Sequence, residues 1–258
     1  MDGLPPRLPE TSYPATLELY RSASRHIADS AGQVDRVRDI LVTEQMPERG
    51  ARAIADSRTG VIYISKVEAD LLEPLAARAA RDGFEALDLE ARADLLRREF
   101  TALHEGSHVT GPAMPPRSEH SKVDTMWEEA LASLNARREQ VAFTQARHGM
   151  TVPRSAVSDI TYGGMAGRVA EVLEVAGHAP DSSGFDDQVR TLAEHVTWRE
   201  RPRWIVEQMV AKRLGAVPPN ANLFELEQLV HGYVQRYERN TGRLVAALED
   251  VVRIAAKA

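Results

Sequence analysis

Apolar residues recur at two different spacings in the first part of the chain, and each spacing predicts a different element. Between residues 15 and 43 they return every three or four positions, which predicts one or two helices with a break near Gly32. Residues 53–55 and 61–65 instead form two short runs around a turn at residues 56–60, and the second run is rich in β-branched residues. This pattern predicts strand, turn, strand, and it is the one clear strand signal in the sequence. The hairpin either covers the core or presents an edge to which an extended substrate backbone can pair.

Helical patterns fill most of the chain after residue 65. Ser65 is placed to cap a helix that ends at Asp82-Gly83, and Asp88 begins another that ends at Gly111. Further helices are predicted near residues 122–148, from Gly163 onward, and near 184–199, 203–215 and 223–256. The expected fold class is α+β, predominantly α. The expected division is a proline-rich extended arm (1–14), a lobe that contains the hairpin (15–121) and a helical lobe (122–258).

The composition of the chain argues against several classes of function. The net charge of −6 argues against a nucleic-acid partner. The sequence contains no uninterrupted run of about 18 apolar residues, so no membrane span is expected. The first residues lack the features of a secretory signal, and a cytoplasmic location is therefore expected. The oligomeric state stays open. Because the chain has no cysteine, any metal must be held by histidine and carboxylate side chains.

Residues 104–108 read His-Glu-Gly-Ser-His, and they fall in the helix predicted to follow Asp88. Residues four apart lie on the same face of a helix, so His104 and His108 can both direct an imidazole nitrogen at one ion. Glu105 lies beside that face, where it can act as the base for a metal-activated water. The apolar residues that precede the motif indicate a buried helix, in which imidazoles need partners. The pattern therefore predicts a Zn²⁺ site for metal-assisted hydrolysis.

A hydrolytic zinc site has three protein ligands and leaves a fourth position for water. The next predicted helix contains Trp127-Glu128-Glu129-Ala130-Leu131, in which two carboxylates stand among apolar residues. Either Glu128 or Glu129 can supply the third ligand.

Tyr162 directly precedes a glycine-rich helix start. Its hydroxyl can donate to the oxyanion that forms when water attacks a carbonyl, or it can simply face water at the edge of the core. The remaining histidines show no ligand spacing, and of these His120 and His195 are the ones that could join the site.

In this order, the three groups resemble a gluzincin-type zinc metallopeptidase, of the clan that includes thermolysin and aminopeptidase N. The likeness is strongest to the small peptidase MA-like domains of that clan. It rests on HEGSH (104–108), WEEALA (127–132) and YGGMAGRVAEVL (162–173). The resemblance implies that Glu129 is the third ligand and Tyr162 the oxyanion donor. It also implies a zincin-like lobe, with the β-hairpin or sheet packed on the metal-binding helix, followed by a helical lobe that carries the third ligand.

Two features depart from that family. The glycine that usually follows the ligand glutamate is Ala130, and no motif for holding a free amino terminus is found. The leading hypothesis is a zinc-dependent hydrolase that cleaves a peptide or amide bond, with Glu105 as general base. One alternative is a zinc enzyme of a specialised biosynthetic pathway that uses the same site on a small molecule. The other is a non-catalytic module whose metal site is structural.

Overall fold

The protein is predominantly helical and contains a small three-stranded sheet, as the α+β prediction expected. The structure, a computed structural model, describes residues 8–9, 12–47, 50–113, 122–152, 163–180, 182–218, 222–235 and 241–255. The chain divides into two compact units: Met1–Ala113 with Asn135–Asp159, and Met114–Leu134 with Ile160–Ala258. The predicted division fell at residue 122, whereas here one continuous helix, α4 (Lys122–His148), contributes its first half to the second unit and its second half to the first.

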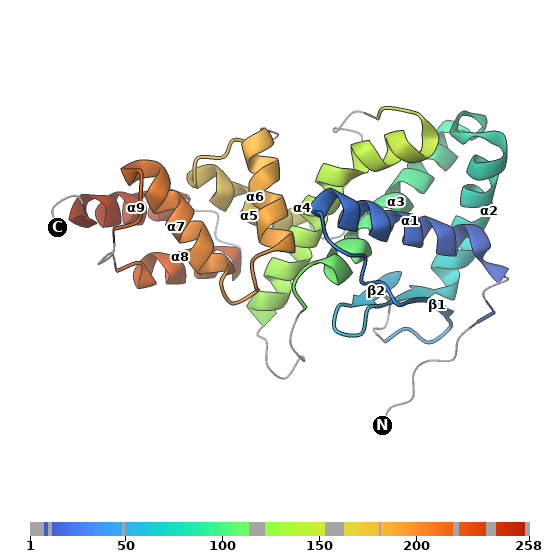
Figure 1. Cartoon of the computed structure of the whole chain (residues 1–258), viewed down its shortest axis with the longest axis horizontal. Helices are drawn as coiled ribbons and strands as arrows, with labels where there is room; N and C mark the ends of the chain where they lie inside the picture. Colours follow the sequence, from blue (N-terminus) through green and yellow to red (C-terminus); the bar gives the residue numbers. More distant parts are fainter. Residues whose placement is uncertain are drawn as a thin grey trace, which may run out of the picture. The chain divides into compact units, whose positions relative to one another are not determined.

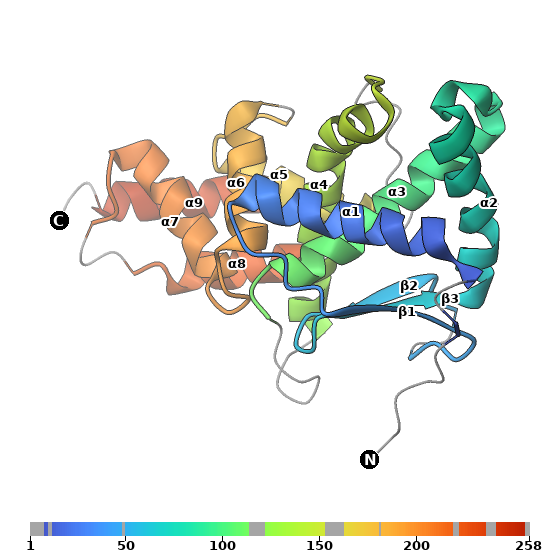
Figure 2. The ribbon, with the colours of Figure 1, turned by 45° about the vertical axis from the view of Figure 1, so that its right-hand side comes forward.

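The first unit contains a sheet covered by helices. Its elements are α1 (Pro14–Ala31), β1 (Asp39–Thr43), β2 (Ala53–Asp56), β3 (Val61–Ser65), α2 (Lys66–Asp82), the short 3-10 helix η2 (Phe84–Ala86), α3 (Leu89–Thr110) and the second half of α4. In Figures 1 and 2, α1 lies alongside α3, with the strands below both helices. The inward faces of these elements form one apolar core that includes Leu19, Ile27, Ile62, Leu72 and Leu103.

The sheet has the order β1-β3-β2. β2 pairs antiparallel with β3 through the predicted turn, so the strand-turn-strand prediction is confirmed. β1 pairs parallel with β3, with Ile40 opposite Ile62. The prediction of helix through residue 43 is therefore wrong after Gly32, whose positive φ of 64° ends α1. The following run Ile40-Leu41-Val42-Thr43 is rich in β-branched residues, and it forms a strand because β3 supplies its hydrogen-bonding partner.

Side-chain caps determine where the helices of this unit begin. Ser65 accepts a hydrogen bond from the Glu68 amide at the start of α2, and Asp88 accepts one from Ala91 at the start of α3, as the sequence predicted. α1 begins differently, because no side chain of its own caps it. Instead, the Glu73 carboxylate of α2 accepts hydrogen bonds from the Ala15 and Thr16 amides at 3.0 and 2.8 Å. The first turn of α1 is thereby tied to α2.

The second unit is helical throughout the part that the structure describes. It contains the first half of α4, then α5 (Gly163–Val175), α6 (Ser183–Glu194), α7 (Arg201–Leu214), α8 (Phe224–Gln235) and α9 (Thr241–Ala255). A single helix over 223–256 was predicted, but α8 and α9 pack against each other, which one straight helix cannot do. The weak helix formers Thr241 and Gly242 stand at the start of α9. The core of this unit includes Trp127, Val172, Leu192, Ile205 and Leu226.

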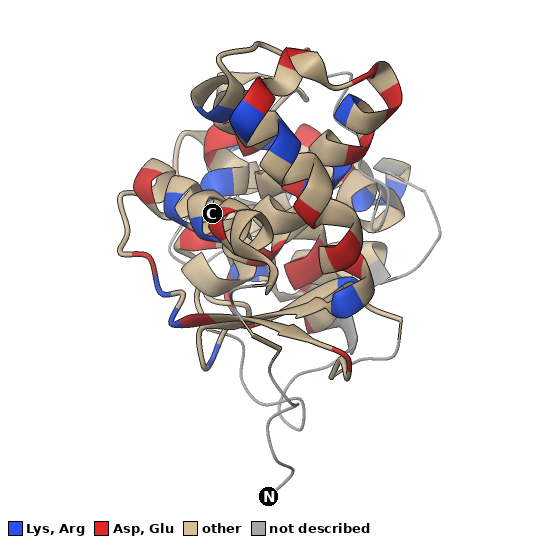
Figure 3. Ribbon diagram, turned by 90° about the vertical axis from the view of Figure 1, so that its right-hand side faces the viewer, with Lys and Arg blue, Asp and Glu red and all other residues tan. Residues whose placement is uncertain are grey.

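Charged residues of both signs are interspersed along the helices (Figure 3). Several form exposed pairs one helical turn apart, such as Lys66 with Asp70 and Arg203 with Glu207. Exposed pairs of this kind contribute about 0.2–0.5 kcal/mol each to helix stability. In the described ranges, no helix combines the length and the apolar character that crossing a bilayer requires.

Candidate metal centre

The last two turns of α3 carry the HEGSH motif into the interior of the first unit. α3 is capped by Asp88 and ends at Gly111, so the motif occupies the final turns of a regular helix. His104, Glu105 and His108 are only 6%, 7% and 8% exposed. Polar groups at this depth require partners, since burying an imidazole or a carboxylate without one costs several kcal/mol by order of magnitude. The burial that the apolar pattern predicted is therefore present at these three side chains.

The two imidazoles direct the same type of nitrogen at each other. Nε2 of His104 lies 3.1 Å from Nε2 of His108, and the ring planes stand at 85°. One ring can donate a proton to the other at this distance. Equally, both lone pairs can face a single cation: with Zn–N bonds of about 2.05 Å, a 3.1 Å separation gives a nitrogen–zinc–nitrogen angle of roughly 100°, near the tetrahedral value. The spacing of the pair is thus compatible with zinc coordination.

Glu129 completes a group of three possible ligands. One ligand atom from each of His104, His108 and Glu129 can be chosen so that all three lie within 4.8 Å of one another. Two histidines and a glutamate form a donor set that suits zinc in hydrolytic sites, where the fourth position is kept for water. These residues thus fit the metal that the sequence predicted.

The structure distinguishes Glu129 from its neighbour Glu128. The Glu128 carboxylate forms a buried ion pair with Arg201 of α7, and their side chains are 9% and 1% exposed. Arg201 also donates from Nε to the Leu192 carbonyl, which holds the guanidinium in place. Glu128 is therefore engaged within the second unit, and Glu129 is the one that is grouped with the histidines. The sequence offered no signal for this pairing, because its members are 73 positions apart.

Glu105 has a buried aromatic neighbour that the sequence did not single out. Tyr20 of α1 is fully buried, and its hydroxyl has no hydrogen-bond partner in the described part of the chain. Burial raises the pKa of Tyr20 well above its ordinary value, and the charges of Glu68 and Glu105 raise it further. Tyr20 therefore stays protonated at neutral pH.

The close approach of α1 to α3 favours the glycine of the motif. A Cβ atom on Gly106 would lie 3.1 Å from Ser24 Cα and 3.4 Å from Ser24 N. A larger residue in the middle of HEGSH would require the α1 backbone to shift by a few tenths of an ångström, because the contact places α1 directly against this turn of α3.

The other candidate residues have separate positions. Tyr162 and His120 lie outside the described residues, so their predicted roles are untested. His195 is exposed at the end of α6 and is not in the group of possible ligands. Two histidines instead bind buried glutamates: His26 with Glu139 at 2.8 Å, and His148 with Glu99 at 2.6 Å. Both are structural pairs within the first unit.

Strand β2 of the hairpin and helix α3 are neighbours. β2 lies at an edge of the three-stranded sheet and packs against α3, the helix that contains residues 104–108. Whether an extended substrate pairs there stays a prediction.

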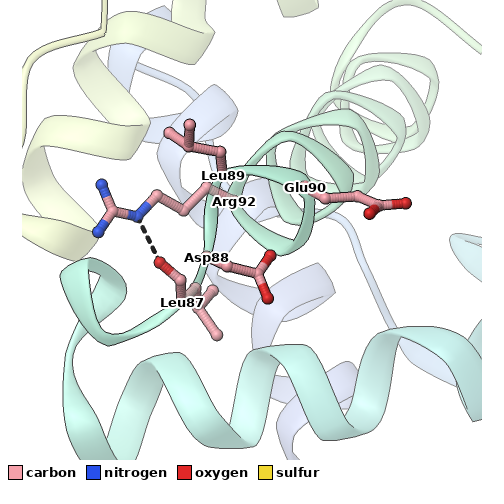
Figure 4. A pocket seen from close by; sticks show the side chains of 5 residues that line it. All are labelled: Leu87, Asp88, Leu89, Glu90 and Arg92. Carbon is pink, nitrogen blue, oxygen red and sulfur yellow. Dashed lines mark hydrogen bonds between the residues drawn. The ribbon is translucent and has the colours of Figure 1, made fainter.

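A surface hollow near the start of α3 is separate from these residues (Figure 4). It is lined by Leu87, Asp88, Leu89, Glu90 and Arg92, and Arg92 donates from Nε to the Leu87 carbonyl. At 1.5 Å per residue, Arg92 stands roughly 18 Å along the helix axis from His104. The hollow is therefore not part of the histidine site.

Comparison of the chain with protein-family models, with curated proteins and with solved structures found no match in any of the three.

Proposed function

We propose that this protein is a zinc-dependent hydrolase that cleaves a peptide or amide bond. The observation that carries the proposal is the pair of buried Nε2 atoms 3.1 Å apart on α3, with the Glu129 carboxylate in the same group. Zinc bound by these three side chains would supply a positive charge that lowers the pKa of a water toward neutrality and polarises a carbonyl. In this proposal the first unit is a zincin-like lobe, and α4 carries the third ligand.

Glu105 has the role of general base. Its carboxylate accepts the proton of the attacking water and returns it to the leaving amine. Its exposure of only 7% supports this role, because burial keeps bulk water away from the carboxylate. Tyr162 is the proposed donor to the oxyanion.

A purely structural metal site is less well supported. Structural zinc sites usually have four protein ligands, whereas the group found among the described residues has three. A buried glutamate directly beside the histidines is also unnecessary in such a site.

The test is digestion of a peptide library by the zinc-loaded protein and by its Glu105→Gln variant, with zinc content measured for both. The proposal predicts cleavage by the wild type, and a loss of about 10²–10⁴-fold in the variant with zinc retained, as expected when a general base is removed. Full activity in Glu105→Gln would refute the assigned role. Zinc retention without cleavage of any peptide would instead direct the search to small-molecule amides.

A further inference from the structure

A buried hydrogen bond joins α3 to α4 at the turn that carries the second histidine. Asn135 of α4 is fully buried, and its Nδ2 donates to Oγ of Ser107 at 3.2 Å. Ser107 directly precedes His108, and its hydroxyl donates to the Leu103 carbonyl at 2.9 Å. Because the hydroxyl proton is used in that bond, Ser107 can only accept from Asn135.

The other end of the Asn135 amide is fixed by a cation. Its Oδ1 accepts from Nε and Nη2 of Arg138 at 3.1 and 2.7 Å. A guanidinium has donors only, so the carbonyl oxygen of Asn135 must face Arg138 and the amino group must face Ser107. The hydrogen bonds that link Arg138 to Asn135 and Asn135 to Ser107 therefore each have a single possible direction, and the Asn135 amide cannot flip.

Arg138 is held in turn by α1. It forms a 2.7 Å ion pair with Glu139, which accepts hydrogen bonds from His26 and Ser30 of α1. The Asn135 side chain is thus held by Ser107 of α3 and by Arg138 of its own helix, and α1 holds Arg138 through Ser30 and Glu139. An apolar contact tolerates sliding of one helix along another, whereas a directional bond with both partners fixed does not.

We infer that Asn135 is a positioning residue of the metal centre, acting through Ser107. Its hydrogen bond to Ser107 sets the axial position and the rotation of α4 relative to the turns of α3 that carry His104 and His108. Since α4 is one continuous helix, this also sets the position of Glu129, which lies six residues earlier and roughly 9 Å along the axis. The inference rests on the proposed zinc site and adds the residue that brings the third ligand into register with the histidine pair.

The same two helices provide a matched control. Thr144 of α4 donates to the buried Glu99 carboxylate of α3 at 3.3 Å, so it is also a buried polar link between α4 and α3. It lies 15 residues after Glu129, roughly 22 Å along the helix. If Asn135 only stabilised the fold, Asn135→Leu and Thr144→Val would have the same effect on metal binding.

The experiment measures zinc affinity by chelator competition in the full chain, for wild type, Asn135→Leu, Ser107→Ala, the double variant and Thr144→Val. Far-UV circular dichroism confirms that each is folded at the temperature used, and Ser107→Ala serves if Asn135→Leu does not fold. We expect Asn135→Leu and Ser107→Ala each to weaken zinc binding by about 10–100-fold, as loss of a residue that orients a ligand does. The double variant should be no weaker than the worse single one, because both remove the same bond. Thr144→Val should retain wild-type affinity.

A spectroscopic readout separates positioning from general loss of stability. With Co²⁺ in place of zinc, the visible absorption of the wild type should be that of a four-coordinate site. The Asn135→Leu spectrum should change toward higher coordination as water replaces Glu129, while that of Thr144→Val should not. Wild-type affinity in both Asn135→Leu and Ser107→Ala, with Glu129→Gln weakened, would overturn the positioning role and leave the zinc site standing. Equal weakening by Thr144→Val would also overturn it. Failure of the wild type to bind zinc would overturn the proposed function and this inference together.

Discussion

Removal of the Arg201 guanidinium is expected to destabilise the second unit strongly. Arg201 is 1% exposed, and its ion pair with Glu128 is buried on both sides. Breaking a buried pair by removing one partner leaves a charge in the interior and costs about 3–5 kcal/mol. Domains of this kind have about 5–15 kcal/mol of stability in total, so Arg201→Met should remove a large part of it.

The assay is urea unfolding followed by tryptophan fluorescence. All three tryptophans, Trp127, Trp198 and Trp204, belong to the second unit, so their emission reports on the unit that holds the pair. With a denaturant slope of about 2 kcal/mol/M, a loss of about 4 kcal/mol lowers the unfolding midpoint by about 2 M. Far-UV circular dichroism of the same samples reports on the helices of both units.

Two further variants show whether the loss of stability is due to the buried charge pair. Arg203→Met removes an exposed arginine from the same helix, where the side chain is 47% exposed and pairs with Glu207 and Glu227. Exposed pairs contribute about 0–1 kcal/mol, so this midpoint should shift little. The double variant Arg201→Met/Glu128→Leu removes both charges and should recover most of the lost stability. A loss below about 1 kcal/mol in Arg201→Met, equal to that of Arg203→Met, would show that the buried pair contributes no more than an exposed one.

Three further predictions concern the first unit. Gly106→Val should destabilise the fold by about 1–3 kcal/mol in thermal unfolding, since its Cβ would press on the Ser24 backbone; an unchanged melting temperature would show that α1 can move aside. Glu73→Ala should lower the urea midpoint by an amount that corresponds to about 1 kcal/mol, because the first amides of α1 lose their acceptor. Burial raises the pKa of Glu139, but the hydrogen bond from His26 and nearby positive charge outweigh it, and the net pKa is lowered from its ordinary value of 4.5. The stability that Glu139 contributes is therefore fully present above that value and is lost as the pH falls through the folded-state pKa. In Glu139→Gln, the free energy of unfolding should therefore fall less steeply as the pH is lowered. An unchanged pH dependence would show that the Glu139 carboxylate is not stabilised in the folded state.

Local signals in the sequence were sufficient to predict most element boundaries of the first unit. Ser65, Asp88 and the glycines that end α2 and α3 act within a few residues of the helix they cap, so they can be recognised without the fold. The hairpin was equally accessible, because its two strands are joined by a short turn. β1 was missed because the spacing of Ile40 and Leu41 also fits a helix, and only pairing with the distant β3 selects the strand.

In the candidate site too, some residues could be predicted from local sequence and others could not. His104, Glu105 and His108 lie in one short motif, and helix geometry alone brings the two histidines together. The links that fix their surroundings join residues far apart in the chain. Asn135 and Ser107 are 28 positions apart, and Arg201 and Glu128 are 73 apart. Such pairs are decided by how the helices pack, which no local pattern encodes.

X-ray absorption spectroscopy of the zinc-loaded protein tests most directly whether one zinc ion is bound by His104, His108 and Glu129. We expect one zinc per chain, with two imidazole nitrogens and carboxylate or water oxygens at about 2.0–2.2 Å. His104→Ala should lose the ion, while His195→Ala, which changes an exposed histidine outside the group, should keep it. A wild-type protein that binds no zinc, or a His104→Ala variant that retains the wild-type spectrum, would show that these residues do not bind zinc.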